Sequence, residues 1–184
     1  MFDKKDRSTF PYWFAHWCAF QMTALNLKCW KPKFLLHDIE KPWLMKLWKD
    51  YKRVQSYHRR NNDHHMIHYI LTGKADWTAM IVDWECSRFT KSSAQLNACQ
   101  EWEKQFSEIE IFLENFHESK NKTCQFIYEN ISKFESMSEF VDKFRVAYFE
   151  LAAVLKKLGF EPRINNDYLM KAKTYYSRYY TKTN

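Results

Sequence analysis

The sequence predicts an all-α protein. Its 184 residues include only two glycines and four prolines, too few for the many tight turns of an all-β fold. Apolar residues recur at intervals of three and four along most of the chain, which is the spacing of one helix face. Hydrophobic residues make up 46% of the chain, enough to bury a core without disulfides. We therefore expect a helical bundle that forms a single domain over residues 1–184.

The first three helices are expected before residue 60. The first spans about Thr9–Leu27, with Pro11 in its first turn, where proline is tolerated. Pro32 begins a short second helix. Pro42 starts a third, in which apolar residues recur at three- and four-residue spacing as far as Tyr51. The N-terminal third of the chain is thus predicted to be almost entirely helical.

Two further helices complete the first half. The sequence Asn-Asn-Asp at 61–63 predicts a turn and the N-cap of a fourth helix, which ends near Gly73. The fifth spans about Asp76–Thr90. The second half is expected to add helices at about 93–116, 123–134, 138–158 and 167–180.

The positive charge of the chain is concentrated in its first half. The net charge is +7, and residues 28–60 hold ten Lys or Arg against three acids, whereas residues 92–142 hold four Lys against ten acids. The basic segment surrounds most of the histidines and would raise the local concentration of an anionic substrate. A solvated basic helix face explains the same surplus equally well.

Other features exclude whole classes of protein. No G-x-x-x-x-G-K or G-x-G-x-x-G sequence is present, which excludes a P-loop or Rossmann nucleotide site. The five cysteines are odd in number and never spaced C-x-x-C, and no signal peptide is recognised, so we expect reduced thiols in the cytoplasm. Polar residues interrupt the aromatic stretch at 10–30, and the chain is expected to be soluble, with no membrane span.

Histidines and carboxylates occur in a suggestive order. Six of the seven histidines lie between residues 16 and 68. His16 comes first, HDIEK at 37–41 follows, then HRRNNDHH at 58–65, and Asp83 lies in MIVDW. Imidazole and carboxylate ligands suit one or two divalent transition metals such as Mn, Fe, Co, Ni or Zn. The order therefore predicts a metal site without thiolates.

The local setting of these residues favours ligand roles. Adjacent His37 and Asp38 would point about 100° apart within a helix, so both can face one ion only at a helix end. Pro42 favours a helix end there. Asp83 lies among apolar residues, where a carboxylate needs a partner. Taken singly, His16 is explained as a hydrogen-bonded core residue, and Asp83 as a helix cap or the partner of an arginine.

The ordered pattern H…HD…D, with helical spacing, resembles the HD-domain superfamily of metal-dependent phosphohydrolases, which are all-helical. HDIEK is similar to the H-D-x-x-K form of its phosphodiesterase-like branches. The longer string, with HRRNNDHH and MIVDWECSR, resembles a group of small uncharacterised bacterial and phage proteins. The resemblance covers about residues 10–90, and residues 91–184 are expected to form supporting helices.

The resemblance implies roles for individual residues. The ligands of the main ion would be His16, His37, Asp38 and Asp83. A second ion would be held by His58 with His64 or His65; alternatively, His58 contacts substrate beside a single ion. Proton transfer to the leaving oxygen would fall to His64 or His65. Phosphoryl oxygens would be contacted by Lys41, His58, Arg59, Arg60 and Arg88.

The predicted function is metal-dependent hydrolysis of a phosphate ester or anhydride of a nucleotide-like substrate. A mixed-valent di-iron oxygenase is one alternative, because some HD-like proteins use six such ligands to activate oxygen. Another is a non-catalytic module that binds a nucleotide or a phosphorylated signal. A third is a nucleic-acid binder using the basic and aromatic segment at 171–182, which equally resembles an amphipathic helix that closes a bundle.

Overall fold

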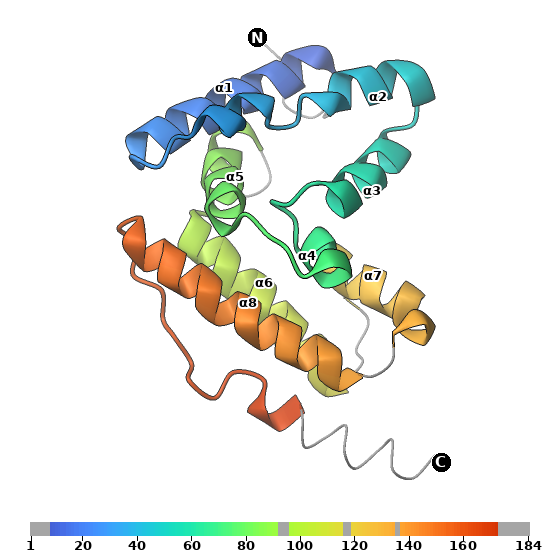
Figure 1. Ribbon diagram of the computed structural model, residues 1–184, viewed down its shortest axis with the longest axis vertical. Helices are drawn as coiled ribbons and strands as arrows, with labels where there is room; N and C mark the ends of the chain where they lie inside the picture. The colour runs from blue at the N-terminus through green and yellow to red at the C-terminus, as the bar shows by residue number, and fades with distance from the viewer. Residues whose placement is uncertain (1–7, 92–95, 116–118, 135–136, 173–184) are drawn as a thin grey trace.

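The computed structural model describes residues 8–91, 96–115, 119–134 and 137–172 and confirms the all-α prediction, since these ranges contain helices and no strand. Figure 1 shows α1 and α2 at one end of the molecule, α6 and α8 side by side at the other, and α5 between them. The elements in chain order are α1 (Phe10–Asn26), η1 (Pro32–Leu36), α2 (Glu40–Trp48), α3 (Tyr51–Asn61), α4 (Met66–Thr72), α5 (Trp77–Thr90), α6 (Ala98–Asn115), α7 (Lys122–Asn130), η2 (Ile131–Lys133) and α8 (Met137–Lys157).

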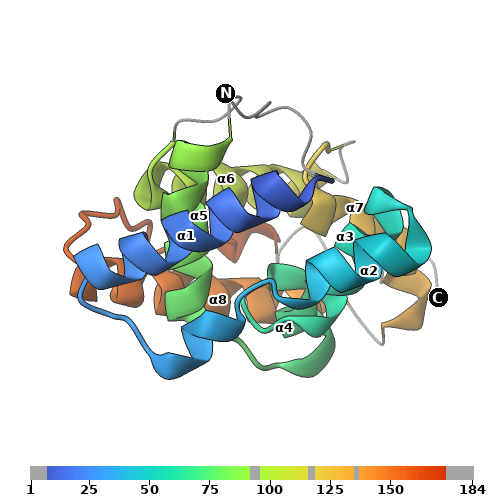
Figure 2. The ribbon, with the colours of Figure 1, turned by 90° about the horizontal axis from the view of Figure 1, so that it is seen from above.

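Helix α5 is the central element. The carboxylate of its N-cap, Asp76, accepts a hydrogen bond from the Ala79 amide at 3.1 Å. One face of α5 packs on α1 over a small core that includes Phe20, and α1 crosses over α5 in Figure 2. The opposite face, with Ile81, packs on the large core of the second half. Asp83 lies on the helix surface between these two faces, so the packing of both cores fixes its position.

The second half of the chain builds the larger core. Helices α6 and α8 pack against each other and against α5. Their aromatic side chains Trp102, Phe106, Phe140 and Phe144 are fully buried. Residues of this size bring most of the apolar area that leaves water on folding. This core supports α5 and, through it, Asp83.

The predicted third helix is two helices. Helix α2 begins at Glu40 and ends before Lys49, which adopts a left-handed conformation with φ 52°. The side chain of Asp50 then accepts a hydrogen bond from the Arg53 amide at 3.2 Å and begins α3. The prediction of one helix was wrong because three- and four-residue apolar spacing continues across the break.

The N-cap predicted at 61–63 was also wrong. Helix α4 begins at Met66, and its N-cap position is the extended residue His65, without a side-chain cap. Residues 62–65 instead form a short non-helical link between α3 and α4 that carries His64 and His65.

Some expected elements lie partly outside the described ranges. This applies to the start and end of the helix expected at 93–116 and to most of the one expected at 167–180, of which residues 167–169 form turns and residues 170–172 are helical. Most of the basic and aromatic segment at 171–182 is outside as well. Within the described ranges, the helices lack the length and apolar character needed to span a bilayer.

Candidate metal centre

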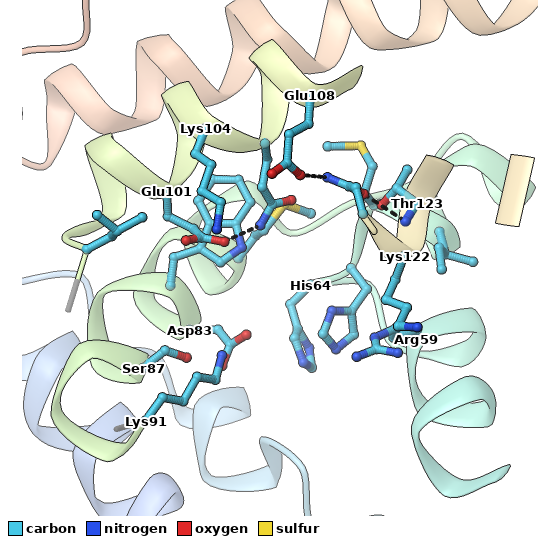
Figure 3. Close-up of a pocket in the computed structure, with 18 of the residues that line it drawn as sticks. Arg59, His64, Asp83, Ser87, Lys91, Glu101, Lys104, Glu108, Lys122 and Thr123 are labelled. Carbon is cyan, nitrogen blue, oxygen red and sulfur yellow. Dashed lines mark hydrogen bonds between the residues drawn. The ribbon is translucent and has the colours of Figure 1, made fainter. Parts of the chain in front are cut away.

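Five segments bring histidines and carboxylates together beside α5. Figure 3 shows Asp83 and His64 next to each other on one side of a cavity. The contributing residues are His16 from α1, His37 and Asp38 from the turn between η1 and α2, His58 from α3, His64 and His65 from the link before α4, and Asp83 from α5.

The turn at His37 and Asp38 explains how two adjacent side chains reach one place. His37 ends the 3-10 helix η1, and Asp38 adopts a left-handed conformation with φ 58°. Aspartate is among the few non-glycine residues that tolerate this region, at a cost of about 1–2 kcal/mol. The Trp13 indole N–H donates to the Asp38 carbonyl at 2.8 Å and holds the turn against α1. The pair thus lies at a helix end, where adjacent side chains need not diverge.

The first group of side chains could surround one ion. His16 Nε2 lies 2.9 Å from Asp83 Oδ1 and 3.8 Å from Asp38 Oδ2. His37 Nε2 lies 3.6 Å from Asp38 Oδ1 and 3.8 Å from Asp83 Oδ1. Two ligands that are each about 2.1 Å from an ion are about 3.0–3.4 Å apart at octahedral or tetrahedral angles. The observed separations are close to that range.

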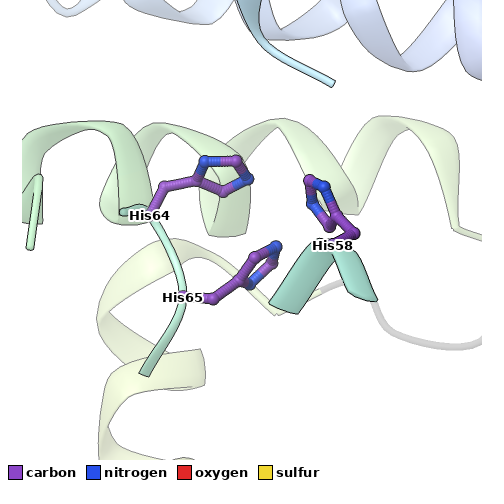
Figure 4. A group of neighbouring side chains, drawn as sticks. All are labelled: His58, His64 and His65. Atoms are coloured by element: carbon purple, nitrogen blue, oxygen red, sulfur yellow. The ribbon is translucent and has the colours of Figure 1, made fainter. Parts of the chain in front are cut away.

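A second group lies on the other side of Asp38. The rings of His58, His64 and His65 converge in Figure 4, with one ring nitrogen of each within 4.8 Å of the others. His58 Nε2 is 3.1 Å and His64 Nε2 is 3.4 Å from Asp38 Oδ1. The Asp38 carboxylate therefore touches both groups, the position of a ligand shared by two ions.

Unpaired polar atoms converge at the centre. Five buried atoms make no well-aligned hydrogen bond among the described residues: Nε2 of His37, His58, His64 and His65, and Oδ1 of Asp38. Two of them, His58 Nε2 and Asp38 Oδ1, lie 3.1 Å apart but are poorly oriented for a hydrogen bond. Leaving one buried polar atom unpaired costs about 1–3 kcal/mol, and native proteins do so rarely. Five such atoms, all nitrogen or oxygen ligand atoms, are what a site for divalent cations would present.

Hydrogen bonds on the outer side of the rings direct their Nε2 atoms inwards. His58 Nδ1 donates to the Glu40 carboxylate, which also accepts from the Asn62 amide at 2.9 Å. His16 Nδ1 lies 3.2 Å from Thr90 Oγ1. An imidazole that donates from Nδ1 presents the Nε2 lone pair on its far side, the arrangement usual for metal-binding histidines. None of these three partners, Glu40, Asn62 and Thr90, was predicted from the sequence. Only Glu40 could have been found, because it lies within the HDIEK motif.

The two carboxylates are held in the ionised form. Burial alone would raise the pKa of Asp38, but the neighbouring His37 and Lys41 outweigh it and lower that pKa well below the ordinary value. Burial opposes ionisation of Asp83 too, yet the hydrogen bond and charge of His16 hold its pKa well below the usual range. Both side chains are thus anionic near neutral pH, as metal ligands must be.

Two of the imidazoles are held in the neutral form. Burial lowers the pKa of His37 well below its ordinary value, against the opposing effect of the Asp38 carboxylate. Burial also lowers the pKa of His65 well below its ordinary value, with further lowering from the neighbouring His64. Neutral imidazole is the form that binds a metal.

Two cavities open from the centre. The larger, about 360 Å³, lies between the histidines and helices α6 and α7 (Figure 3). The other, about 200 Å³, is bordered by α1, α2 and α3 and has an aromatic lining: Phe10, Tyr12, Trp13 and Tyr51. Four residues line both cavities: Arg59, His65, Asp83 and Lys91. The centre is thus reached from two sides of different chemical character.

The predicted substrate contacts divide into two sets. Lys41 Nζ lies 2.5 Å from Asp38 Oδ2 and lines the aromatic cavity, and Arg59 lines both cavities. Arg60 instead covers the Phe126 ring at 5.2 Å. Neither Arg60 nor Arg88 is among the described residues that line the two cavities.

Arg88 forms an ion pair away from the centre. Its guanidinium lies 2.8 Å from the carboxylate of Glu85, which also accepts a hydrogen bond from the Ala98 amide at 2.8 Å. Ala98 is the first residue of α6, so this carboxylate joins the end of α5 to the start of α6. The geometry brings Lys41 and Arg59 to the centre and leaves Arg60 and Arg88 outside it.

Comparisons of the chain with known protein families, with characterised proteins and with solved structures give no match. The residues of the centre therefore carry the evidence for its chemistry.

Proposed function

We propose that this chain is a metal-dependent phosphohydrolase of the HD type that binds two divalent transition-metal ions. The observation that carries the proposal is the convergence of buried, unpaired ligand atoms around the shared carboxylate of Asp38. The candidate ligands are five imidazoles and two carboxylates, which suit Mn, Fe, Co, Ni or Zn. The Cys86 sulfur also lies within 4.8 Å of ligand atoms of His16 and Asp83, but burial raises its pKa well above the ordinary value and keeps it a thiol. The order of these residues along the chain, H…HD…H…HH…D, adds support.

The ions would be held by two sets of residues that share Asp38. The first set is His16, His37, Asp38 and Asp83, and the second is Asp38 and His58 with either His64 or His65. Divalent ions bound there supply a water of lowered pKa as the nucleophile and neutralise charge on phosphoryl oxygens.

The remaining roles fall to side chains around the centre. The Lys41 ammonium and the Arg59 guanidinium, which both line the aromatic cavity, contact phosphoryl oxygens as charge-assisted donors. Proton transfer takes place at the Nε2 atom of whichever of His64 and His65 does not hold an ion. Because burial keeps His65 neutral, its ring must first accept a proton before it donates one to a leaving oxygen.

The aromatic cavity supports a nucleotide-like substrate. Tyr12, Trp13 and Tyr51 line it within reach of the centre. Aromatic rings stack on bases, with about 1–3 kcal/mol per base in single-stranded nucleic-acid complexes. A planar ring in this cavity would leave its phosphate at Asp38 and Lys41, which line the same space.

The proposal is tested by metal analysis and turnover on the same preparation. Protein purified without chelator should contain about two equivalents of transition metal and hydrolyse bis(p-nitrophenyl) phosphate, and a chelator should abolish the hydrolysis until Mn²⁺ is restored. Two equivalents of iron with visible absorption and oxygen consumption, but no hydrolysis, would indicate an oxygenase. Ligand binding without turnover would indicate a non-catalytic module. No binding of Mn, Fe, Ni or Zn would refute the metal centre.

A Lys41→Ala variant should retain its metal and lose turnover. The Lys41 side chain is 19% exposed, so water weakens its contact with the phosphoryl group. We therefore take the free energy of this contact from the lower end of the range for hydrogen bonds to charged groups. That corresponds to about a 10- to 30-fold loss of kcat/KM. Lys46→Ala, in the same helix but at an exposed position, is the matched control and should keep wild-type turnover. Loss of metal from Lys41→Ala would show that the ammonium maintains the Asp38 site rather than the substrate.

A further inference from the structure

The cavity of about 360 Å³ is built by both halves of the chain. On one side it is lined by residues of the metal centre, among them His64, His65 and Asp83. On the other it is lined by α6, by the start of α7 and by the segment just before α7. Figure 3 shows Lys104 on the far side of this space from Asp83, and Lys122 near Arg59. The second half therefore forms a wall of the space next to the candidate centre.

Positive charge predominates in this cavity. Its lining contains five basic side chains: Arg59, Lys91, Lys104, Lys120 and Lys122. It contains three acidic ones, of which Asp83 belongs to the centre. The other two accept hydrogen bonds from amides: Glu101 from Gln105 at 2.9 Å and Glu108 from Asn121 at 3.1 Å.

The lysines of the second half are available to an anion. Among the described residues, no carboxylate forms an ion pair with Lys104 or Lys120. The Lys122 ammonium donates only to the neutral amide of Gln125, at 2.8 Å. Segment 92–142 as a whole is acidic, with ten acids against four lysines, yet three of those lysines line this one cavity. Cations gathered in a concave site raise the local concentration of anions and contact them directly.

The cavity has room for more than the group that reacts. Its volume, about 360 Å³, lies in the lower part of the range for small-molecule sites, about 300–1,000 Å³. A phosphoryl group bound at His65 and Asp83 would lie at its edge, since these residues also line the aromatic cavity. Lysines on the opposite wall would then face another part of the same molecule.

We propose that this cavity binds a second anionic group of the substrate, so that the chain selects molecules with two phosphoryl groups over those with one. The proposal rests on the proposed function for the position of the reacting phosphoryl group. One phosphoryl group lies at the histidine and carboxylate centre, and the second is bound by Lys104 and Lys122 with Arg59 nearby. The second half of the chain thereby determines substrate specificity as well as supporting α5.

The test compares two ligands that differ only in the second anion. Adenosine 3′,5′-bisphosphate and adenosine 5′-monophosphate are titrated into the metal-loaded full chain by calorimetry. The bisphosphate should bind about tenfold or more tightly, since its second anion adds at least one charged hydrogen bond. In Lys104→Ala/Lys122→Ala the difference should fall below about threefold. Lys156→Ala/Lys157→Ala, which removes equal charge from the exposed end of α8, should keep the wild-type difference.

Several results would overturn this assignment. Equal affinity of the wild type for the two nucleotides, or no binding of either, would do so. So would a preference that survives in the Lys104→Ala/Lys122→Ala variant. Inorganic phosphate that binds twice to the wild type and once to the variant, without nucleotide discrimination, would indicate a site for a free anion. Hydrolysis of bis(p-nitrophenyl) phosphate, which has no second anion, should be unchanged in the Lys156→Ala/Lys157→Ala control. That hydrolysis tests the proposed function separately.

Discussion

Replacing Asp38 by asparagine should remove metal binding and turnover together. The carboxylate touches both groups of imidazoles, with His58 Nε2 at 3.1 Å and His37 Nε2 at 3.6 Å from its Oδ1. An amide keeps the shape of the side chain but loses the negative charge and one of two oxygen ligands. Loss of a partner that only orients a ligand typically costs about 10- to 100-fold, so loss of the shared ligand should exceed about 100-fold in kcat. Elemental analysis should show less than one ion per chain.

Asparagine is the informative replacement because of the backbone. Asp38 has φ 58°, a conformation that asparagine tolerates and alanine does not, so Asp38→Ala would add backbone strain to the loss of the ligand. Asp63→Ala is the control, since this exposed carboxylate lies 3.7 Å from Lys33 and is outside the centre. The far-ultraviolet circular dichroism of both variants should match the wild type. An Asp38→Asn protein with full metal content and full activity would disprove the assignment of the centre.

Local sequence signals predict most of the helices, but they fail where tertiary packing determines where a helix ends. Helices α5 and α8 have long, uninterrupted apolar spacing, and their bounds lie within one residue of those expected from the sequence. The break at Lys49 has no such signal, because a left-handed lysine is an unusual helix end. Asp50 is a good N-cap residue, but because the apolar spacing continues past it, the sequence is equally consistent with an exposed position inside one helix.

The candidate site shows a similar division. Short side chains in a fixed order along the chain, such as His37 and Asp38, could be singled out because their chemistry is specific. Long basic side chains could not be placed: Arg59 reaches the centre, whereas its neighbour Arg60 covers Phe126. Which of two adjacent arginines faces a cavity depends on the rotation of α3 against its neighbours, and a local sequence does not encode that rotation.

The basic cavity was beyond the reach of sequence reasoning. Lys104 and Lys122 lie in a segment whose overall charge is negative, and their spacing of 18 residues matches no motif. Only the packing of α6 and α7 against the rest of the chain brings them to the same space as Asp83. The resemblance to the HD-domain superfamily covers only residues 10–90. It therefore predicts metal ligands but not which substrates the site selects.

Acid should destabilise the metal-free protein before the carboxylates of the centre titrate. Burial holds the pKa of His37 and of His65 well below 6.5, whereas in the unfolded chain both rings take up a proton as pH falls through about 6.5. The unfolded state then binds more protons, so the free energy of unfolding falls as pH falls. Between pH 7.5 and 5.5 we expect the free energy of unfolding to fall by about 2 kcal/mol, with the larger share from His37 because His65 is only half-buried.

The carboxylates act in a different pH window. Asp38 and Asp83 have lowered pKa values, so their stabilisation is complete above pH 3.8 and cannot explain a change between pH 7.5 and 5.5. Urea unfolding of the metal-free chain at the two pH values measures the effect. His65→Gln should lose about a third of it, while His68→Gln, whose ring nitrogen lies 2.9 Å from the Arg60 carbonyl outside the centre, should keep it all. Saturating metal should preserve or steepen the dependence, because bound ions keep the folded imidazoles unprotonated while the unfolded chain still takes up protons. Equal stability of the metal-free chain at both pH values would show that the buried rings titrate in the fold as they do in the unfolded chain.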